Sequence, residues 1–290
     1  MAVQDVGVPA TRLHVPDSMT QVTKLTRYQL REYLRSSRFV ALAGIVLAIG
    51  GIISFLVAHF RTALVSDPTA FYGSFWGDGA DLVIVLSAVF FGGDAIAGEF
   101  QNKTGYFLMG LPIRRATVYA GKYLAAFLAS TAMVLLYLAI LVANGLYYFH
   151  ANAFPWQLGL SLLLAIAYLT AVLGATFLFS SLFKTSAYGF VLTAILFLFG
   201  FTLLGDLVTD LVGTQPWMII SYASSTIGSV FSSSVNWSLH GTVSQVPGLR
   251  PGSTTTVYAA GIAQGLVLTL SYTFLTAMWG LWLFEREEFT

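Results

Sequence analysis

Long uncharged apolar runs alternate with shorter polar segments along most of this chain. A helix needs roughly 20 apolar residues to cross about 30 Å of hydrocarbon. The pattern predicts six such helices, at 39–58, 81–97, 123–147, 158–183, 187–205 and 257–284. The runs lack the alternation of barrel strands, and open strands would leave backbone groups unpaired in lipid. We therefore expect an all-α polytopic membrane protein.

The connections between these runs differ in length. Residues 184–186 are the only link between the fourth and fifth runs, which predicts a tight helical hairpin. Residues 206–256 are rich in Ser, Thr and Gly but keep an apolar stretch around Trp217–Val230. We expect short helices in the outer leaflet there, because protein can cover their backbone. The alternative is a partly ordered outer loop.

A basic stripe precedes the first run. Its members recur at spacings of three and four, which places them on one helical face: Lys24, Arg27, Arg31, Arg35 and Arg38. Apolar residues lie broadly opposite: Val22, Leu25, Leu30 and Tyr33. This is typical of an amphipathic helix at a membrane interface, facing anionic lipid headgroups. The alternative is a helix whose charge only sets topology. We divide the chain into a cytosolic tail with this helix (1–38) and a six-helix transmembrane domain (39–290).

The distribution of Lys and Arg predicts the orientation. Of the 14 Lys and Arg residues, all but Arg61 and Arg250 fall on the same side as the N-terminus. Positive charge is retained in the cytosol, so both termini are predicted to be cytosolic in a multi-pass protein of the cell membrane. The sequence Asn-Trp-Ser at Asn236 then lies outside as a possible glycosylation site.

Composition excludes several classes of function. Only 9% of the residues are charged, against about 25% in soluble domains. The net charge of +1 gives no reason to expect a nucleic-acid partner. The chain has no cysteine, its four histidines are isolated, and neither HExxH nor GxSxG occurs. We predict no catalytic residue, no metal site and no enzyme activity in this chain.

The dipeptide Gly121–Lys122 is similar to part of a phosphate-binding loop. That loop needs a Gly five residues earlier and a Ser or Thr after the Lys. Ala116 and Tyr123 occupy those positions. We therefore expect no nucleotide to bind this chain.

Polar groups are scarce within the predicted spans. Asp94 lies near the end of the second, where we expect it to reach the interface or to pair with a Lys or Arg. Gln264 lies in the sixth, where we expect an interhelical hydrogen bond. It belongs to the sequence "GIAQG" (261–265), a GxxxG step that permits close helix packing. An ion-coupled carrier would need more intramembrane polar groups than these.

The charged segment 93–122 carries an ordered series of residues between the second and third runs. An acidic residue is followed by Thr-Gly, a Leu-containing stretch that ends in Pro, an Arg, and a Lys that opens the third run. Together with the six-run layout, this segment resembles the membrane subunit of type-2 ABC exporters, with Thr-Gly in place of the usual Gly-Thr. The residues that the resemblance assigns to ATPase coupling are Glu99, Lys103, Thr104, Gly105, Pro112, Arg115 and Lys122.

The resemblance implies an ATP-driven efflux permease. Two permease chains, identical or related, would form the pathway and associate with two separate ABC ATPase subunits, which would bind ATP and Mg²⁺. The basic helix and the loop 98–115 would be the docking surface. The alternative is a stand-alone secondary transporter or channel, against which stand the few charges in the spans and the lack of visible repeated halves. No pattern in the spans selects a substrate.

Overall fold

The computed structural model describes residues 17–60, 67–102, 113–150, 153–183, 185–232, 235–247 and 254–286. Within these residues six helical segments are long and apolar enough to cross a membrane: Ser37–His59, Pro68–Gln101, Arg115–Phe149, Trp156–Leu182, Ser186–Val212 and Ile262–Arg286. The predicted all-α polytopic class is confirmed.

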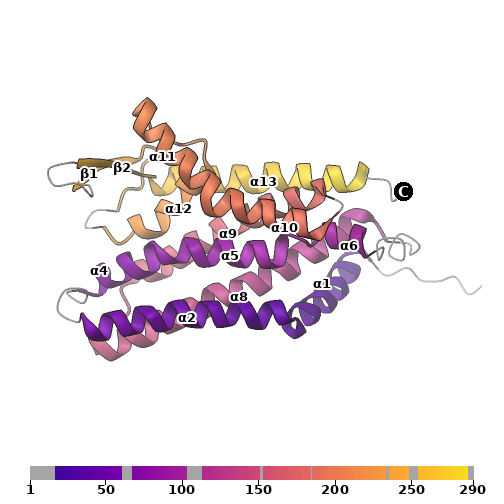
Figure 1. Ribbon diagram of the computed structural model, residues 1–290, viewed down its shortest axis with the longest axis horizontal. Coiled ribbons are helices and arrows are strands. Elements are labelled where there is room, and N and C mark those ends of the chain that lie inside the picture. Colours follow the sequence, from indigo (N-terminus) through magenta and orange to yellow (C-terminus); the bar gives the residue numbers. More distant parts are fainter. Residues whose placement is uncertain are drawn as a thin grey trace, which may run out of the picture.

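The six segments run side by side along the long axis of the molecule (Figure 1). They contain α2 (Ser37–His59), α4 (Pro68–Tyr72), η1 (Gly73–Gly77), α5 (Gly79–Gly92), α6 (Ala97–Gln101), α8 (Arg115–Phe149), α9 (Trp156–Leu182), α10 (Ser186–Ile195), η3 (Leu196–Gly200), α11 (Phe201–Val212) and α13 (Ile262–Arg286). The basic helix α1 (Ser18–Arg35) crosses one end obliquely. The remaining elements are α12 (Ile220–Ser229), β1 (Thr242–Pro247) and β2 (Thr254–Ala259).

The two ends of the bundle carry different elements. The end with α1, α6 and the close of α13 is called the α6 end, at the right of Figure 1. The opposite end, with α4, α12 and the strands, is called the hairpin end. Both ends of the described chain, at residues 17 and 286, lie toward the α6 end.

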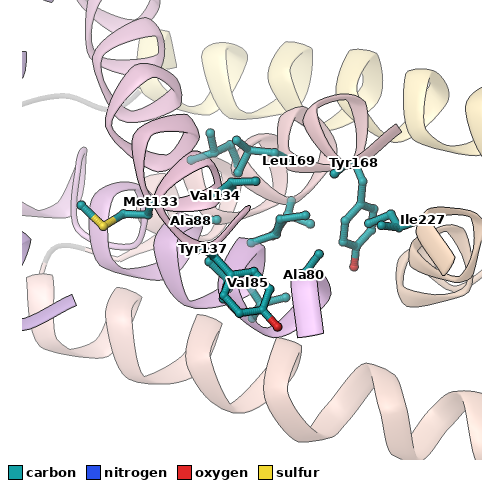
Figure 2. Close-up of a cluster of buried hydrophobic side chains, with 14 of the residues drawn as sticks. Ala80, Val85, Ala88, Met133, Val134, Tyr137, Tyr168, Leu169 and Ile227 are labelled. Atoms are coloured by element: carbon teal, nitrogen blue, oxygen red, sulfur yellow. The ribbon is translucent and has the colours of Figure 1, made fainter. Parts of the chain in front are cut away.

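The second, third and fourth spans form the centre of the bundle. In their most apolar stretches 72, 50 and 61% of residues are buried, against 22, 11 and 11% in the first, fifth and sixth. Small residues allow the central helices to approach closely, as is usual between helices in membranes. Figure 2 shows Ala80, Val85 and Ala88 of α5 facing Val134 and Tyr137 of α8. The outer three spans leave most residues of their apolar stretches uncovered within this chain.

Two buried aromatic side chains in the centre find hydrogen-bond partners for their polar atoms. The indole N–H of Trp76 donates to Ser161 Oγ at 2.9 Å, and the Tyr137 hydroxyl donates to the Phe75 carbonyl at 2.6 Å. Both bonds tie the beginning of the second span to its neighbours α8 and α9. A buried aromatic ring with a satisfied polar tip adds specificity to apolar packing.

The second span starts earlier than the predicted residue 81. It begins at Pro68 and passes through the π-helical turn η1 before α5. Asp78 and Asp81 lower the local hydropathy, so the predicted run began only at residue 81. Tertiary packing keeps the segment helical: a Cβ on Gly77 would lie 2.6 Å from the Cα of Gly228 in α12, so Gly is needed at this contact.

The fifth span is longer than the predicted 187–205. It contains the π-helical turn η3 and continues to Val212. Gly213 ends it in the left-handed conformation, with φ of 67°, a common end for a helix. Asp206 and Asp210 reduced the hydropathy of this last part, and both carboxylate side chains are exposed or partly exposed on α11.

The segment before the last span contains one of the expected short helices, α12, and an antiparallel β-hairpin that the pattern did not predict. Val243 pairs with Tyr258, and Thr242 with Ala259. Because residues 257–259 belong to β2, the last span starts at Ile262 rather than at 257. Gln264 accepts a 3.4 Å hydrogen bond from the Gly261 N–H, so its contact is local and not the expected interhelical one.

Asn236 lies in the loop between α12 and β1. Its side-chain amide donates to the His240 carbonyl at 2.9 Å, and its Oδ1 accepts from the Ser238 N–H at 3.0 Å. The side chain thus holds a local turn. Glycosylation of Asn236 stays a prediction.

Candidate coupling site at the α6 end

Helix α1 packs against the bundle with one face and exposes the other. The Thr26 hydroxyl donates to the Gly121 carbonyl of α8 at 3.2 Å. A Cβ on Gly121 would lie 2.8 Å from Leu25 Cβ, so the two helices meet closely at this glycine. All five residues of the basic stripe are exposed: Lys24, Arg27, Arg31, Arg35 and Arg38.

A sharp bend joins α1 to α2 at Ser36. Its hydroxyl accepts from the Phe39 N–H at 3.2 Å and donates to the Tyr33 carbonyl at 2.7 Å, which caps the new helix. The Tyr33 hydroxyl in turn donates to the Phe91 carbonyl at 2.9 Å. Burial, followed by the negative charge of Asp94, raises the pKa of Tyr33 well above its usual value, so this donor stays protonated.

The turn between α5 and α6 holds Asp94 in a small polar network. Arg38 Nη1 pairs with Asp94 Oδ2, and the Ser186 hydroxyl donates to the same oxygen at 3.0 Å. Asp94 is 14% exposed and Arg38 53%. The expectation that Asp94 pairs with a cation is confirmed. Through Arg38 and Ser186, the Asp94 carboxylate links the turn between α5 and α6 to the starts of α2 and α10.

Glu99 and Lys122 form the second ion pair. Lys122 Nζ lies 2.5 Å from Glu99 Oε1, and it also donates to the Ala95 carbonyl at 3.1 Å. The Lys122 side chain is 9% exposed and the Glu99 side chain 15%. The Lys of the supposed phosphate loop therefore holds α6 against α8, and a pair this deeply buried is costly to break from one side.

Helix α6 is also held from a third direction. Its first turn has free N–H groups, and Ser180 Oγ of α9 accepts from those of Ile96 and Ala97 at 3.0 and 3.1 Å. The Gln101 side chain at its other end accepts from the Ser186 N–H at 2.8 Å. Helix α6 is thus fastened to α8, α9 and α10.

Arg115 makes a different contact from the one expected. Its Nη1 donates to the carbonyls of Glu285 and Phe284, at 2.8 and 3.4 Å. These carbonyls belong to the last turn of α13, where a cation satisfies free acceptors and complements the helix dipole. Arg115 therefore joins the start of the third span to the end of the sixth.

A crevice of about 530 Å³ separates α1 from α6 and the start of α8. Tyr28 and Glu32 line it from α1, and Asn102 lines it from the end of α6. Both ion pairs border it, since Arg38, Asp94, Glu99 and Lys122 also contribute to its walls. Within the described part of the chain, no three His, Asp or Glu side chains lie close enough to hold a metal ion.

A comparison with protein families identifies the family of this chain. The family model described as ABC-2 family transporter protein matches residues 33–200, which is more than half of the chain. The chain belongs to the ABC-2 transporter family. A comparison with curated proteins found no match. The match spans α2 to η3, so the turn at Asp94, helix α6 and the start of α8 all lie within the part that defines this permease.

The predicted coupling residues of the permease fall into two groups. Glu99, Arg115 and Lys122 are described, and each is engaged inside the chain. Lys103, Thr104, Gly105 and Pro112 lie outside the described residues. Sequence reasoning did not assign Tyr28, Glu32 or Asn102 to the coupling site. Of the three, Tyr28 could have been noticed in the sequence, because it is an aromatic residue next to Arg27 of the basic stripe. In the structure its side chain is 72% exposed.

Proposed function

We propose that this chain is the permease subunit of an ATP-driven exporter, and that it forms the pathway with a second permease chain, identical or related. Separate ABC ATPase subunits bind the ATP and Mg²⁺. The chain lies in the cell membrane with both termini and the α6 end in the cytosol. The observation that supports this best is the crevice at the α6 end of an ABC-2 family permease, bordered by both described ion pairs.

The exposed residues of the crevice are the ones proposed to contact the ATPase. Tyr28 and Glu32 on α1 and Asn102 after α6 line the crevice and are exposed. Glu99 and Lys122 are nearly buried, so their proposed role is to position α6 rather than to touch the partner. Arg115 has the same kind of role, because it binds α13.

The contacts of α6 support a proposal for how a movement of this helix reaches the membrane spans. A displacement of α6 acts directly on α8 through Lys122, on α9 through Ser180 and on α10 through Gln101. We infer that closure of an ATPase dimer beneath the crevice moves these helices together, as coupled elements that switch between two packed arrangements. The exposed basic stripe of α1 then faces anionic lipid headgroups, as proposed for an interfacial helix.

The complex itself is tested by purification. The tagged full-length permease is extracted from its native membranes in a mild detergent, and the bound proteins are identified by mass spectrometry. We expect an ABC ATPase subunit in near-equal amount and ATP hydrolysis by the eluate. A permease that elutes without any ATPase and carries ion-driven flux in liposomes would instead support a stand-alone carrier.

The docking surface is tested by variants in the same purification. Tyr28→Ala combined with Glu32→Ala is expected to lower the recovered ATPase at least about tenfold, since an exposed aromatic anchor in a crevice is a typical hot spot. The matched control is Tyr147→Ala, which removes an aromatic that is 71% exposed at the hairpin end of α8. Equal ATPase recovery by the double variant and the control would exclude the crevice as the docking surface.

A further inference from the structure

A second cavity lies at the hairpin end, away from the coupling site. It has a volume of about 630 Å³ and lies between the start of the second span and α12, with Tyr258 and Ala259 of β2 in its wall. Pockets for small organic molecules usually measure about 300–1,000 Å³. The cavity is therefore large enough for such a molecule.

The hydroxyl groups of α12 present acceptors to this cavity. Ser224, Ser225 and Ser229 line it, and each hydroxyl donates its hydrogen to a backbone carbonyl three residues earlier, at 2.7, 2.7 and 3.2 Å. A hydroxyl oxygen has two lone pairs and one hydrogen. With the hydrogens used inside the helix, Ser224 and Ser229 keep acceptor capacity toward a ligand, whereas Ser225 Oγ already accepts from the Ala260 N–H at 2.9 Å.

Two carboxylates share the same wall. Asp78 is exposed, and Asp81 is partly exposed while its Oδ1 is buried and has no hydrogen-bond partner among the described residues. The Tyr168 side chain lies beside Asp81. The ring of Tyr168 reaches from α9 toward Ile227 of α12 (Figure 2). None of the lining residues that the structure describes is Lys, Arg or His, so among the described residues no cation of the wall itself offsets the two carboxylates.

An acceptor-rich wall with an unsatisfied buried carboxylate oxygen favours a cationic donor, because an unpaired buried oxygen is costly. The volume exceeds what a bare metal ion fills, and no metal-binding cluster was found among the described residues. The rings of Phe231 and Tyr258 also line the cavity, and aromatic faces attract cations. These features together suit an ammonium group on an apolar body.

We propose that this cavity binds the protonated amine of an organic cation, with Asp81 as the counter-charge and Asp78 in a supporting position. The α12 hydroxyls accept the remaining N–H hydrogens, and the apolar body lies against Phe231 and Tyr258. This binding goes beyond the proposed coupling to an ATPase. It is tested without ATP, so its failure and the failure of the proposed function are distinguishable.

The first experiment compares two probes of the same shape. Tryptamine carries a protonated amine on an indole ring, and tryptophol carries a neutral hydroxyl on the same scaffold. Binding of each to the purified full-length permease in nanodiscs is measured by calorimetry. We expect tryptamine to bind at least about tenfold more tightly than tryptophol, the equivalent of about 1.4 kcal/mol. Equal affinity of the two, or no binding of tryptamine at millimolar concentration, overturns the proposal.

Matched carboxylate variants locate the interaction. Asp81→Asn is expected to weaken tryptamine binding at least about tenfold, and Asp78→Asn less, because charged hydrogen bonds are strongest when buried. Asp206→Asn removes an exposed carboxylate on α11 outside the cavity and is expected to leave the affinity unchanged. If Asp81→Asn and Asp206→Asn bind tryptamine equally well, the assignment of Asp81 is wrong.

A third measurement does not depend on the folding of an Asp81 variant. The chain contains no cysteine, so Ser74→Cys places a single thiol in the cavity wall at an exposed position. Bound tryptamine is expected to slow modification of this thiol by a methanethiosulfonate reagent several-fold. Ser18→Cys at the start of α1 is the control and is expected to react at the same rate with and without tryptamine. A Ser74→Cys thiol that tryptamine does not protect contradicts binding at this place.

Discussion

The two ends of the bundle treat their carboxylates in opposite ways. At the α6 end, Asp94 and Glu99 are paired with Arg38 and Lys122, and both pairs join different helices. At the hairpin end, Asp81 keeps a buried oxygen without a partner among the described residues. The first arrangement fixes a junction between elements, which suits the coupling surface proposed above. The second leaves a carboxylate oxygen without a partner beside a cavity, which suits the binding site proposed above. The few carboxylates near the spans of this chain therefore occur in two different settings, one paired with a cation and one without a described partner.

The largest expected effect comes from breaking the buried pair at the α6 end. Lys122→Met removes the cation of a pair in which Glu99 is 15% exposed, and removal of one partner from a buried pair typically costs about 3–5 kcal/mol. We expect a large fall in the thermal midpoint of the detergent-solubilised permease. The double variant Lys122→Met with Glu99→Gln is expected to regain most of that loss. A single variant as stable as the parent would show that the pair does not hold α6.

The hairpin end is expected to be held by close backbone contact rather than by charge. Gly77→Ala places a Cβ 2.6 Å from the Cα of Gly228, where no side chain can move aside, so overpacking of about 1–3 kcal/mol is expected. Loss of stability is measured by thermal unfolding followed through tryptophan fluorescence, since Trp76 lies in the same turn. Gly44→Ala in α2 meets nothing within 4 Å and is the control, with no loss expected. Equal stability of the two variants would contradict the contact.

A smaller effect is expected from the bond between the third and sixth spans. Arg115→Ala removes a charged donor from the last carbonyls of α13, which is worth about 1–2 kcal/mol. Faster hydrogen exchange is expected in the last turn of α13. The neighbouring Arg114→Ala, an exposed side chain, is expected to leave that exchange unchanged. If both variants exchange alike, Arg115 does not cap this helix.

The smallest effect is expected from Arg38→Ala. This residue is 53% exposed, and ion pairs near solvent contribute about 0–1 kcal/mol. Asp94 keeps its hydrogen bond from Ser186, so a shift of the thermal midpoint by only a degree or two is expected. Raised salt is expected to reduce that difference further, because it screens exposed charges. A fall in the thermal midpoint as large as that of Lys122→Met would contradict the expectation that the exposed pair contributes less stability than the buried one.

The outcome for individual residues shows where sequence reasoning succeeded and where it stopped. Asp94 was expected to reach the interface or to find a cation, and Arg38 provides one because α1 bends at Ser36. Arg115 and Lys122 were assigned to coupling from a resemblance, but their partners were not predictable. Arg115 binds a helix end 169 or more positions away in the chain, which no local pattern records. Asp81 was the first residue of the predicted second run and was passed over, although it lines the cavity at the hairpin end.

The sequence by itself determined the membrane class, the six helical spans and the basic stripe on α1. These depend on hydropathy and helical periodicity, which are local properties of a chain in lipid. Only the tertiary structure decided the early start of the second span, the β-hairpin, the partners of Lys122 and Arg115, and the cavity around Asp81. Most of these depend on which distant segments meet, such as Gly77 against Gly228 and α6 against α8. Such contacts arise from packing and from the pairing of buried polar groups, and the order of residues along the chain does not record them.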